Sequence, residues 1–220
     1  MSQFQNVIIL KELYNEAWEI KKHTLGEKHA DTIMMYGQIG RLYHDMGNLE
    51  KARPFLEENL RVRKEILDPQ HPQIAVAKTP LAALLVDLGE YKMAYELAKD
   101  SVDLRSEILG PLHPYTAFSY DTLSLAELGR DNVQAALFAA NKSISIRMEV
   151  LGPDHFRCAQ AHMTLAKVKA ALGRGRDAID EAKKAHEINV KALREGHPFV
   201  KVSYDFLNMI QERHVFENVP

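Results

Sequence analysis

Five short strings recur along the chain: LGEKH (residues 25–29), LDPQH (67–71), LGPLH (109–113), LGPDH (151–155) and LREGH (193–197). The leucine that opens each string and the histidine that closes it both return every 42 residues. Self-similarity at one fixed period of this length is typical of repeat proteins, in which one supersecondary unit stacks on the next. The chain is therefore expected to be a series of equivalent repeats.

Other positions follow the same period. One column is aliphatic in every repeat, and another is always alanine. They hold Ile39, Leu81, Leu123, Leu165 and Leu207, and Ala52, Ala94, Ala136 and Ala178. Apolar residues within a repeat lie three or four apart, which is the spacing of an amphipathic helix and not of a strand. Each alanine opens a second helix, where a small side chain lets two helix backbones approach closely.

Turn residues separate the helices. Gly47, Gly89 and Gly173 stand where a first helix must end, because glycine enters the left-handed region without a steric penalty. In the third repeat Asp131 takes that place and Gly129 precedes it, so we expect that helix to end early. The predicted helices are 7–25, 31–46, 48–67, 73–88, 91–109, 115–129, 132–151, 157–172, 176–194 and 199–213.

The composition restricts the possible functions. The chain has 220 residues, a formal charge of -2 and a sequence pI near 6.6, and its basic residues are mixed with acidic ones. Nucleic-acid binding needs a dense basic surface, so it is not expected. The longest apolar runs are far shorter than the roughly 20 residues that span a bilayer. We therefore expect a cytoplasmic protein without membrane insertion.

The second repeat, from His71 through Leu81 and Gly89 to Gly110, resembles a tetratricopeptide repeat in the 42-residue form found in kinesin light chains. The resemblance covers nearly the whole chain. It implies an all-α, right-handed α-α superhelix of about ten antiparallel helices, forming one solenoid domain over residues 1–220. The expected divisions are a half-repeat 1–29, repeats 30–71, 72–113, 114–155 and 156–197, and a half-repeat 198–220.

The resemblance also implies a non-catalytic scaffold or adaptor, which binds a peptide or helical segment of a partner protein in a concave groove lined by the first helices. Kinesin light chains carry an asparagine just before the repeated aliphatic residue of each first helix. Here that column holds Gln38, Pro80, Thr122, Thr164 and Phe206. The asparagine ladder is therefore missing, and Pro80 is expected to kink or unwind its helix.

The groove-facing candidates are the residues around that column: Met34, Gln38, Arg41, His44, Val76, Thr79, Ala83, Val86, Phe118, Asp121, Thr122, Leu125, Gln160, Met163, Thr164 and Lys167. Arg41 and Lys167 lie far apart in this set with Asp121 between them, which argues against a clamp for a peptide carboxylate. The apolar centre suits an amphipathic helix or an extended segment with apolar anchors. Phe118 and Leu125 fit either the groove or the core between repeats.

No cofactor, metal or enzymatic activity is expected. The five repeated histidines recur at the structural period, which spreads them along one edge, whereas zinc needs its ligands around one point. We expect these histidines to have a structural role in the turn. The segment Leu172–Arg176 lacks the ending of a phosphate-binding P-loop and is more simply a turn. Cys158, the one cysteine, falls in an apolar helical pattern that suits a structural thiol.

The two ends of the chain support a second functional hypothesis. The first predicted helix carries Val7, Ile8, Ile9, Leu10 and Trp18, and the last carries Phe206, Leu207 and Ile210; both helices lack a partner within their repeat. Solenoids normally need polar end faces for solubility. Either these helices cap the stack or their faces bind another molecule. The chain is then a regulatory or oligomerisation domain of a larger protein, and a homo-oligomer is one form of that contact.

Overall fold

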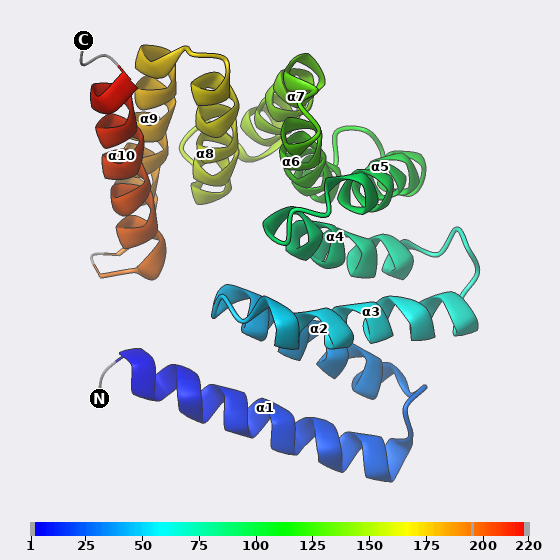
Figure 1. The fold of residues 1–220 in the computed structure, drawn as a ribbon. Coiled ribbons are helices and arrows are strands. Elements are labelled where there is room, and N and C mark those ends of the chain that lie inside the picture. The colour runs from blue at the N-terminus through cyan, green and yellow to red at the C-terminus, as the bar shows by residue number, and fades with distance from the viewer. Residues whose placement is uncertain (1–2, 195, 218–220) are drawn as a thin grey trace. The chain divides into compact units, whose positions relative to one another are not determined.

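The computed structural model describes residues 3–194 and 196–217, and their side chains from residue 12 to 194 and from 196 to 212. Figure 1 labels the helices. They are α1 (Gln3–Leu25), α2 (Ala30–Asp45), α3 (Leu49–Ile66), α4 (Pro72–Asp87), α5 (Tyr91–Ile108), α6 (Pro114–Gly129), α7 (Val133–Leu151), α8 (Phe156–Ala171), α9 (Gly175–Ala192) and α10 (Pro198–Glu217). The all-α class is confirmed, and each predicted boundary lies within two residues of the observed one, except that α1 starts and α10 ends four residues further out.

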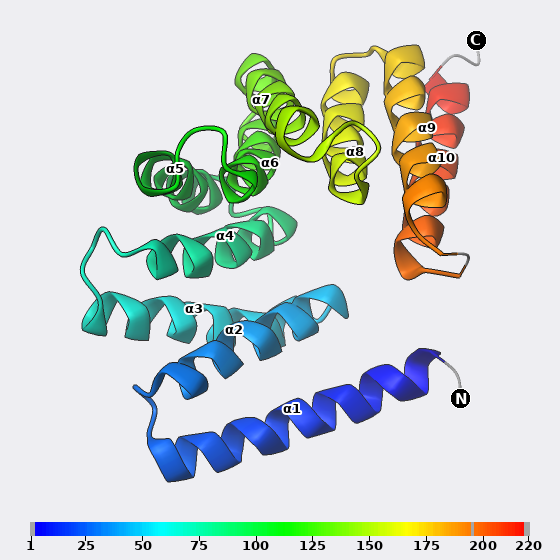
Figure 2. The ribbon, with the colours of Figure 1, turned by 180° about the vertical axis from the view of Figure 1, so that it is seen from behind.

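The chain forms two compact units, Met1–Leu104 and Arg105–Pro220. In the first, α1 packs on α2, α2 on α3, and α4 on both α2 and α3. In the second, each helix from α6 to α10 packs on the next, and α8 also contacts α6 and α10 (Figures 1 and 2). Both units thus contain antiparallel helix pairs. That the units form one continuous solenoid domain stays a prediction.

The repeated histidines begin the first helices. Nδ1 of His29, His71, His113 and His155 accepts the backbone N–H of the residue two positions on, as the N-cap of α2, α4, α6 and α8. His197 makes the same bond to Phe199 at the start of α10, at 3.2 Å. The first N–H groups of a helix have no partner within it, so a side-chain acceptor at this position stabilises the helix start. The expected role in the turn is confirmed.

The left-handed turn residues end the first helices. Gly47, Gly89 and Gly173 have φ of 72°, 77° and 71°. Asp131 adopts the same conformation in the third repeat, with φ of 61°. The expectation that α6 would end early is wrong, because α6 has 16 residues, as α2, α4 and α8 do. Gly129 is simply its last helical residue, and aspartate tolerates the left-handed region better than most side chains do.

Proline does not interrupt the helices in which it lies. Helix α4 continues through Pro80, so the expected unwinding of its early part is wrong. The neighbouring Thr79 is fully buried, and its hydroxyl donates to the carbonyl oxygen of Ala75, 2.9 Å away. A proline removes one helical N–H, and packing around the helix outweighs that loss here. Pro54 lies inside α3 in the same way.

Small residues set the contact between paired helices. Ala52, Ala94, Ala136 and Ala178 have no exposed surface. Within the pair of α2 and α3, a Cβ added to Gly40 would lie 2.6 Å from the side chain of Leu56, well inside van der Waals contact. The periodic small residues are therefore positions at which the backbones of two helices approach.

Candidate protein-binding surface

One position on each first helix is exposed in every repeat. It holds Met34 on α2, Val76 on α4, Phe118 on α6, Gln160 on α8 and Val202 on α10. The four apolar members are 46%, 42%, 41% and 51% exposed in chain order. On α2, α4, α6 and α8 the residues directly before and after this position are buried, although other positions of the same helices, such as Gln73 and Tyr115, are also exposed. We call these five residues the exposed column; its first two members belong to unit 1 and the other three to unit 2.

The remaining candidates differ in accessibility. Gln38, Arg41 and Lys167 are exposed. Partly buried are His44, Ala83, Val86, Leu125 and Met163. Met163 packs against two buried clusters, so it belongs largely to the core. The accessible candidate surface is accordingly the exposed column with Gln38 and Arg41 beside it in unit 1, and Leu125 and Lys167 beside it in unit 2.

Four candidates do not reach the surface. Thr79, Asp121, Thr122 and Thr164 are at most 4% exposed. The asparagine-equivalent column therefore points inward at Thr122 and Thr164, as it does at Phe206. These residues lie three or four positions after the exposed column, which turns their side chains by about 40° to 60° around the helix, and that rotation is enough to bury them. These four residues are removed from the candidate surface.

Asp121 forms a buried ion pair. Its Oδ2 accepts from Nη2 of Arg147 on α7 at 2.5 Å, and Nη1 of Arg147 donates to the carbonyl oxygen of Arg157 at 2.8 Å. Both side chains are almost fully buried. Burial raises the pKa of the Asp121 carboxyl, and the charge of Arg147 opposes that rise. The pair joins α6, α7 and α8, and it adds no net charge to the surface.

A second buried cluster joins α8 and α9. Oε2 of Glu181 lies 2.5 Å from Nδ1 of His162, and its Oε1 accepts from Nζ of Lys169 at 2.8 Å. Burial opposes ionisation of Glu181, but the hydrogen bonds and charges of His162 and Lys169 outweigh it and lower the pKa of Glu181 to about 2. The cluster holds α8 and α9, the two helices of one pair, together. Periodicity did not single it out, because His162 and Glu181 have no counterparts in the other repeats.

The residues considered for metal and phosphate chemistry have local roles. Nδ1 of each repeated histidine is used by a helix cap, as described above. Within the described residues, no three or more His, Cys, Asp or Glu side chains converge as a metal site would require. Arg174, the N-cap residue of α9, pairs with Asp177 in the first turn of that helix. Cys158 is buried, burial raises the pKa of its thiol, and Sγ donates to the carbonyl oxygen of Gly152.

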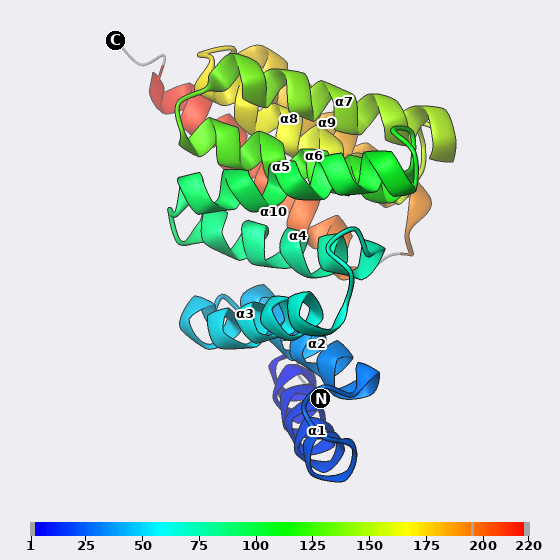
Figure 3. The ribbon, with the colours of Figure 1, turned by 90° about the vertical axis from the view of Figure 1, so that its right-hand side faces the viewer.

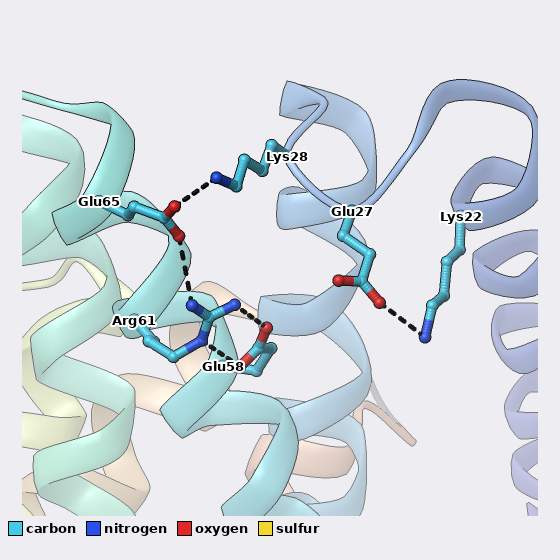
Figure 4. A network of polar contacts seen from close by, with 6 residues as sticks. All are labelled: Lys22, Glu27, Lys28, Glu58, Arg61 and Glu65. Carbon is cyan, nitrogen blue, oxygen red and sulfur yellow. Dashed lines mark hydrogen bonds and ion pairs between the residues drawn. The ribbon is translucent and has the colours of Figure 1, made fainter.

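Unit 1 also holds an aromatic hollow that the sequence analysis missed. It has a volume of 460 Å³ and is lined by Trp18, Lys22, Glu27, Tyr36, Pro54, Phe55 and Glu58. Nζ of Lys22 lies 5.2 Å from the centre of the Trp18 ring and 2.9 Å from Oε1 of Glu27. Figure 4 shows this ion pair, and also the pairing of Glu58 with Arg61 and of Glu65 with Arg61 and Lys28. The charged side chains at the rim are thus satisfied by one another.

None of the helices that the structure describes has both the length and the apolar character needed to cross a membrane. Family models of the tetratricopeptide repeat match residues 32–73 and 73–149, which together are more than half of the chain. The chain is a tetratricopeptide repeat protein. The expected resemblance to the kinesin light chain type is confirmed, and a search of curated proteins finds no match.

Solved structures share the tetratricopeptide fold. A variant of a putative kinesin light chain of Podosopora anserina, with nearly identical TPR-like repeats, is 23% identical, with a TM-score of 0.67 over 86% of this chain and 89% of the other. BtubC (BKLC) from P. vanneervenii is 16% identical, also with a TM-score of 0.67, over 96% of this chain and 84% of the other. At these identities the likeness establishes the fold of this repeat protein and leaves its ligand to be argued from its own residues.

Proposed function

We propose that this tetratricopeptide repeat protein is a non-catalytic scaffold that binds a peptide or helical segment of a partner protein through its first helices. The observation that carries the proposal is the exposed column. An apolar side chain recurs on the surface at one position of α2, α4, α6 and α10, and on α2, α4 and α6 the residues directly before and after it are buried. Exposed apolar surface that repeats in register is a typical feature of a protein-binding face.

The chemistry of this surface favours apolar anchors over polar recognition of a peptide backbone. The column that carries asparagine in kinesin light chains is buried at Thr122, Thr164 and Phe206, so it has no amide to offer a ligand in unit 2. Phe118 and Val202 in the same unit are exposed and apolar, with Gln160 between them. Affinity in such an interface comes from a few buried apolar contacts. The partner segment should therefore present apolar side chains along one face.

The charges on the surface fit this assignment. Asp121 is neutralised internally by Arg147, so it does not repel an acidic ligand and does not attract a basic one. Arg41 and Lys167 are exposed cations in different units. A carboxylate clamp needs several cations around one point, so terminal-carboxylate recognition is not proposed. A cytoplasmic location and the absence of nucleic-acid ligands stay predictions from composition.

The test is selection of peptides from a displayed library against the full chain, followed by titration of the best peptide. Phe118→Glu should weaken binding by about thirtyfold, because losing a central hot spot costs about 2 kcal/mol. Phe138→Glu is the matched control, since Phe138 is 60% exposed but lies on the second helix α7. Equal losses in both variants, or a loss only in Phe138→Glu, would place recognition elsewhere and refute the proposal.

The second candidate function, a regulatory or oligomerisation domain that contacts partners through its ends, is favoured at one end only. At α10 the capping alternative is favoured, because Phe206 and Ile210 are buried against Ala166, Ala178 and Ala182 and Leu207 packs beside them. For α1, the side chains of Val7, Ile8, Ile9 and Leu10 lie outside the described residues, and Trp18 packs inward against Tyr36 and Phe55. Two other residues of α1, Leu13 and Ile20, remain exposed at that end.

A further inference from the structure

One apolar position of the second helices is buried in every repeat except at α1. Val62, Leu104, Ile146 and Ile188 occupy it on α3, α5, α7 and α9, and none of them is more than 9% exposed. Ile20 occupies it on α1 and is 56% exposed. Leu13 lies seven residues earlier, two turns away on the same side of α1, and is also exposed. The face that carries Leu13 and Ile20 is called the outer face of α1.

The other repeats show what covers this position. Ile188 and Ala185 of α9 pack against Cys158 and Ala159 of α8, the first helix of the same repeat. The packing of α2 on α3 follows the same rule, since Gly37 and Gly40 of α2 lie against Asn59 and Leu56 of α3. The position of Ile20 is therefore one half of the contact between the two helices of a repeat, and the described residues contain no first helix that covers it on α1.

The opposite side of α1 is already engaged. Lys21 pairs with Asp31 of α2 at 2.7 Å, the side-chain amide of Asn15 donates to the hydroxyl of Tyr43 at 3.3 Å, and Trp18 packs edge-on against Tyr36. Figure 3 shows α1 beside α2 at the edge of unit 1. Helix α2 therefore takes the side of α1 that faces the next repeat, and it leaves the outer face uncovered.

The complete repeats also define the kind of helix that fits. Three first helices carry two small buried residues seven positions apart, as in Ala75 with Ala82, Ala117 with Ser124, and Ala159 with Ala166, while α2 carries Ile33 with Gly40. Small residues on this stripe allow the backbones to approach closely. An occupant of the outer face of α1 should accordingly be an amphipathic α-helix with small residues seven apart.

A second copy of the chain does not offer such a helix within the described residues. The first helices α2, α4, α6 and α8 already cover their own second helices. Helix α10 has no second helix after it, but Lys201 and Asn208 replace the two small residues, and Lys201 is exposed. That end carries the polar face that caps a solenoid. On this stripe α10 is more polar than α1, since only Tyr204 between Lys201 and Asn208 adds an exposed aromatic ring, whereas Leu13 and Ile20 are aliphatic.

We propose that the outer face of α1 is a second protein-binding site, which takes an amphipathic helix of a partner protein with small residues seven apart. The site lies on a helix that carries no member of the exposed column, and it does not depend on the function proposed for that column. The partner helix would lie antiparallel to α1, bury Leu13 and Ile20, and complete a repeat. Burying a large aliphatic side chain stabilises such a contact by the transfer of its apolar surface from water.

The probe is a fluorescently labelled synthetic peptide of residues 155–171 of this chain with Cys158→Ser, which reproduces the first helix that covers Ile188. Its fluorescence anisotropy is measured as the full chain is added, and saturable binding is expected. The control peptide carries Ala159→Glu and Ala166→Glu and should not bind, because charged side chains on the contact stripe prevent close approach.

Protein variants locate the site. Ile20→Glu should weaken binding of the peptide by about tenfold or more, which corresponds to the loss of one buried aliphatic side chain. Val190→Glu is the matched control, because Val190 is 54% exposed on α9 and should bind as the wild type does. Leu13→Glu is the second variant, used if Ile20→Glu lowers the helical content in circular dichroism.

Three results would overturn the proposal. The first is equal binding of the two peptides, and the second is no effect of either α1 variant. The third is a wild-type dimer in sedimentation velocity that Ile20→Glu converts to a monomer, because the occupant would then be a second copy of this chain.

Discussion

Nδ1 of His113 lies 3.1 Å from the backbone nitrogen of Tyr115 and accepts its N–H, which caps helix α6. Four other histidines make the same bond 42 residues apart, so the most regular feature of the sequence is a device that starts helices. Proline follows three of these five caps, and its fixed φ suits the first helical position. Helix starts, rather than a ligand, account for the periodic histidines.

His113→Ala should lower the free energy of unfolding by about 1 kcal/mol, because it leaves a helix N-terminus uncapped. His113→Asn should retain most of the stability, since asparagine is a strong N-cap. Urea unfolding followed by circular dichroism measures both. His23→Ala is the control, because His23 is exposed and lies near the end of α1, away from any cap. A loss in His113→Asn as large as that in His113→Ala would show that the ring contributes by packing and not by capping.

Ala136→Arg should strongly destabilise the protein, because Ala136 is fully buried and its carbonyl oxygen accepts from Ser124 Oγ of the paired helix at 2.8 Å. Overpacking costs roughly 1 to 3 kcal/mol, and burial of an unpaired charge adds to it. Ala94→Arg should behave alike. Ala135→Arg is the control on the same helix, where the side chain is exposed. Thermal unfolding gives the comparison, and equal midpoints for Ala135→Arg and Ala136→Arg would contradict the assigned register.

The helices and their pairing were predictable from sequence because the signals are local and recur. A histidine cap, a left-handed glycine and an alanine at a close contact each act within a few residues, and they recur five, three and four times in one register. The two details that were predicted wrongly concern residues that the fold accepts at positions where they are usually unfavourable. Pro80 is accommodated inside α4, and Asp131 takes a glycine conformation without shortening α6. Packing of α4 outweighs the helix-breaking tendency of Pro80, and aspartate tolerates the left-handed region better than most side chains do.

The candidate surface was less predictable for a geometric reason. A shift of one position along a helix rotates the side chain by about 100°, so Phe118 is exposed while Ser119 is fully buried. Burial of Asp121 depends on Arg147, which lies 26 residues away. Arginine recurs at this position as Arg63 and Arg105, but that period does not indicate that Arg147 meets Asp121. The outer face of α1 became visible only when Ile20 was compared with four buried counterparts. Sequence periodicity identified the column, and only the structure measured its exposure.

Glu181 should make stability depend on acid pH. Its pKa in the folded protein is lowered to about 2, below the value near 4.3 of a free glutamate. A carboxyl with a lowered folded pKa contributes stability above its unfolded pKa and loses it as the pH falls through the folded pKa. The contribution, about 3 kcal/mol at most, should disappear between about pH 5 and pH 2.

Urea unfolding at a series of pH values tests this dependence. Glu181→Gln should be less stable than the wild type at neutral pH, and the difference should shrink toward pH 2. Glu187→Gln, an exposed change on the same helix, should follow the wild type throughout. A wild-type advantage over Glu181→Gln that stays constant with pH would mean that shape and packing, and not the charge of Glu181, hold α8 to α9.

Asp131→Gly should stabilise the protein slightly. Asp131 has φ of 61°, while the equivalent positions in three other repeats are glycines with φ of 71° to 77°. A residue other than glycine in the left-handed region lowers the free energy of unfolding by about 1 kcal/mol. Replacing it by glycine removes this cost but also makes the unfolded chain more flexible, which offsets part of the gain in stability. A rise of about 2 °C in the midpoint of thermal unfolding is expected. The reverse change, Gly89→Asp, should lower the midpoint, because a Cβ there meets no neighbouring atom within 4 Å and only the backbone conformation opposes it. If Asp131→Gly instead lowers the midpoint, the aspartate side chain stabilises the turn by more than its conformation costs, and the turn between α6 and α7 is held by that side chain.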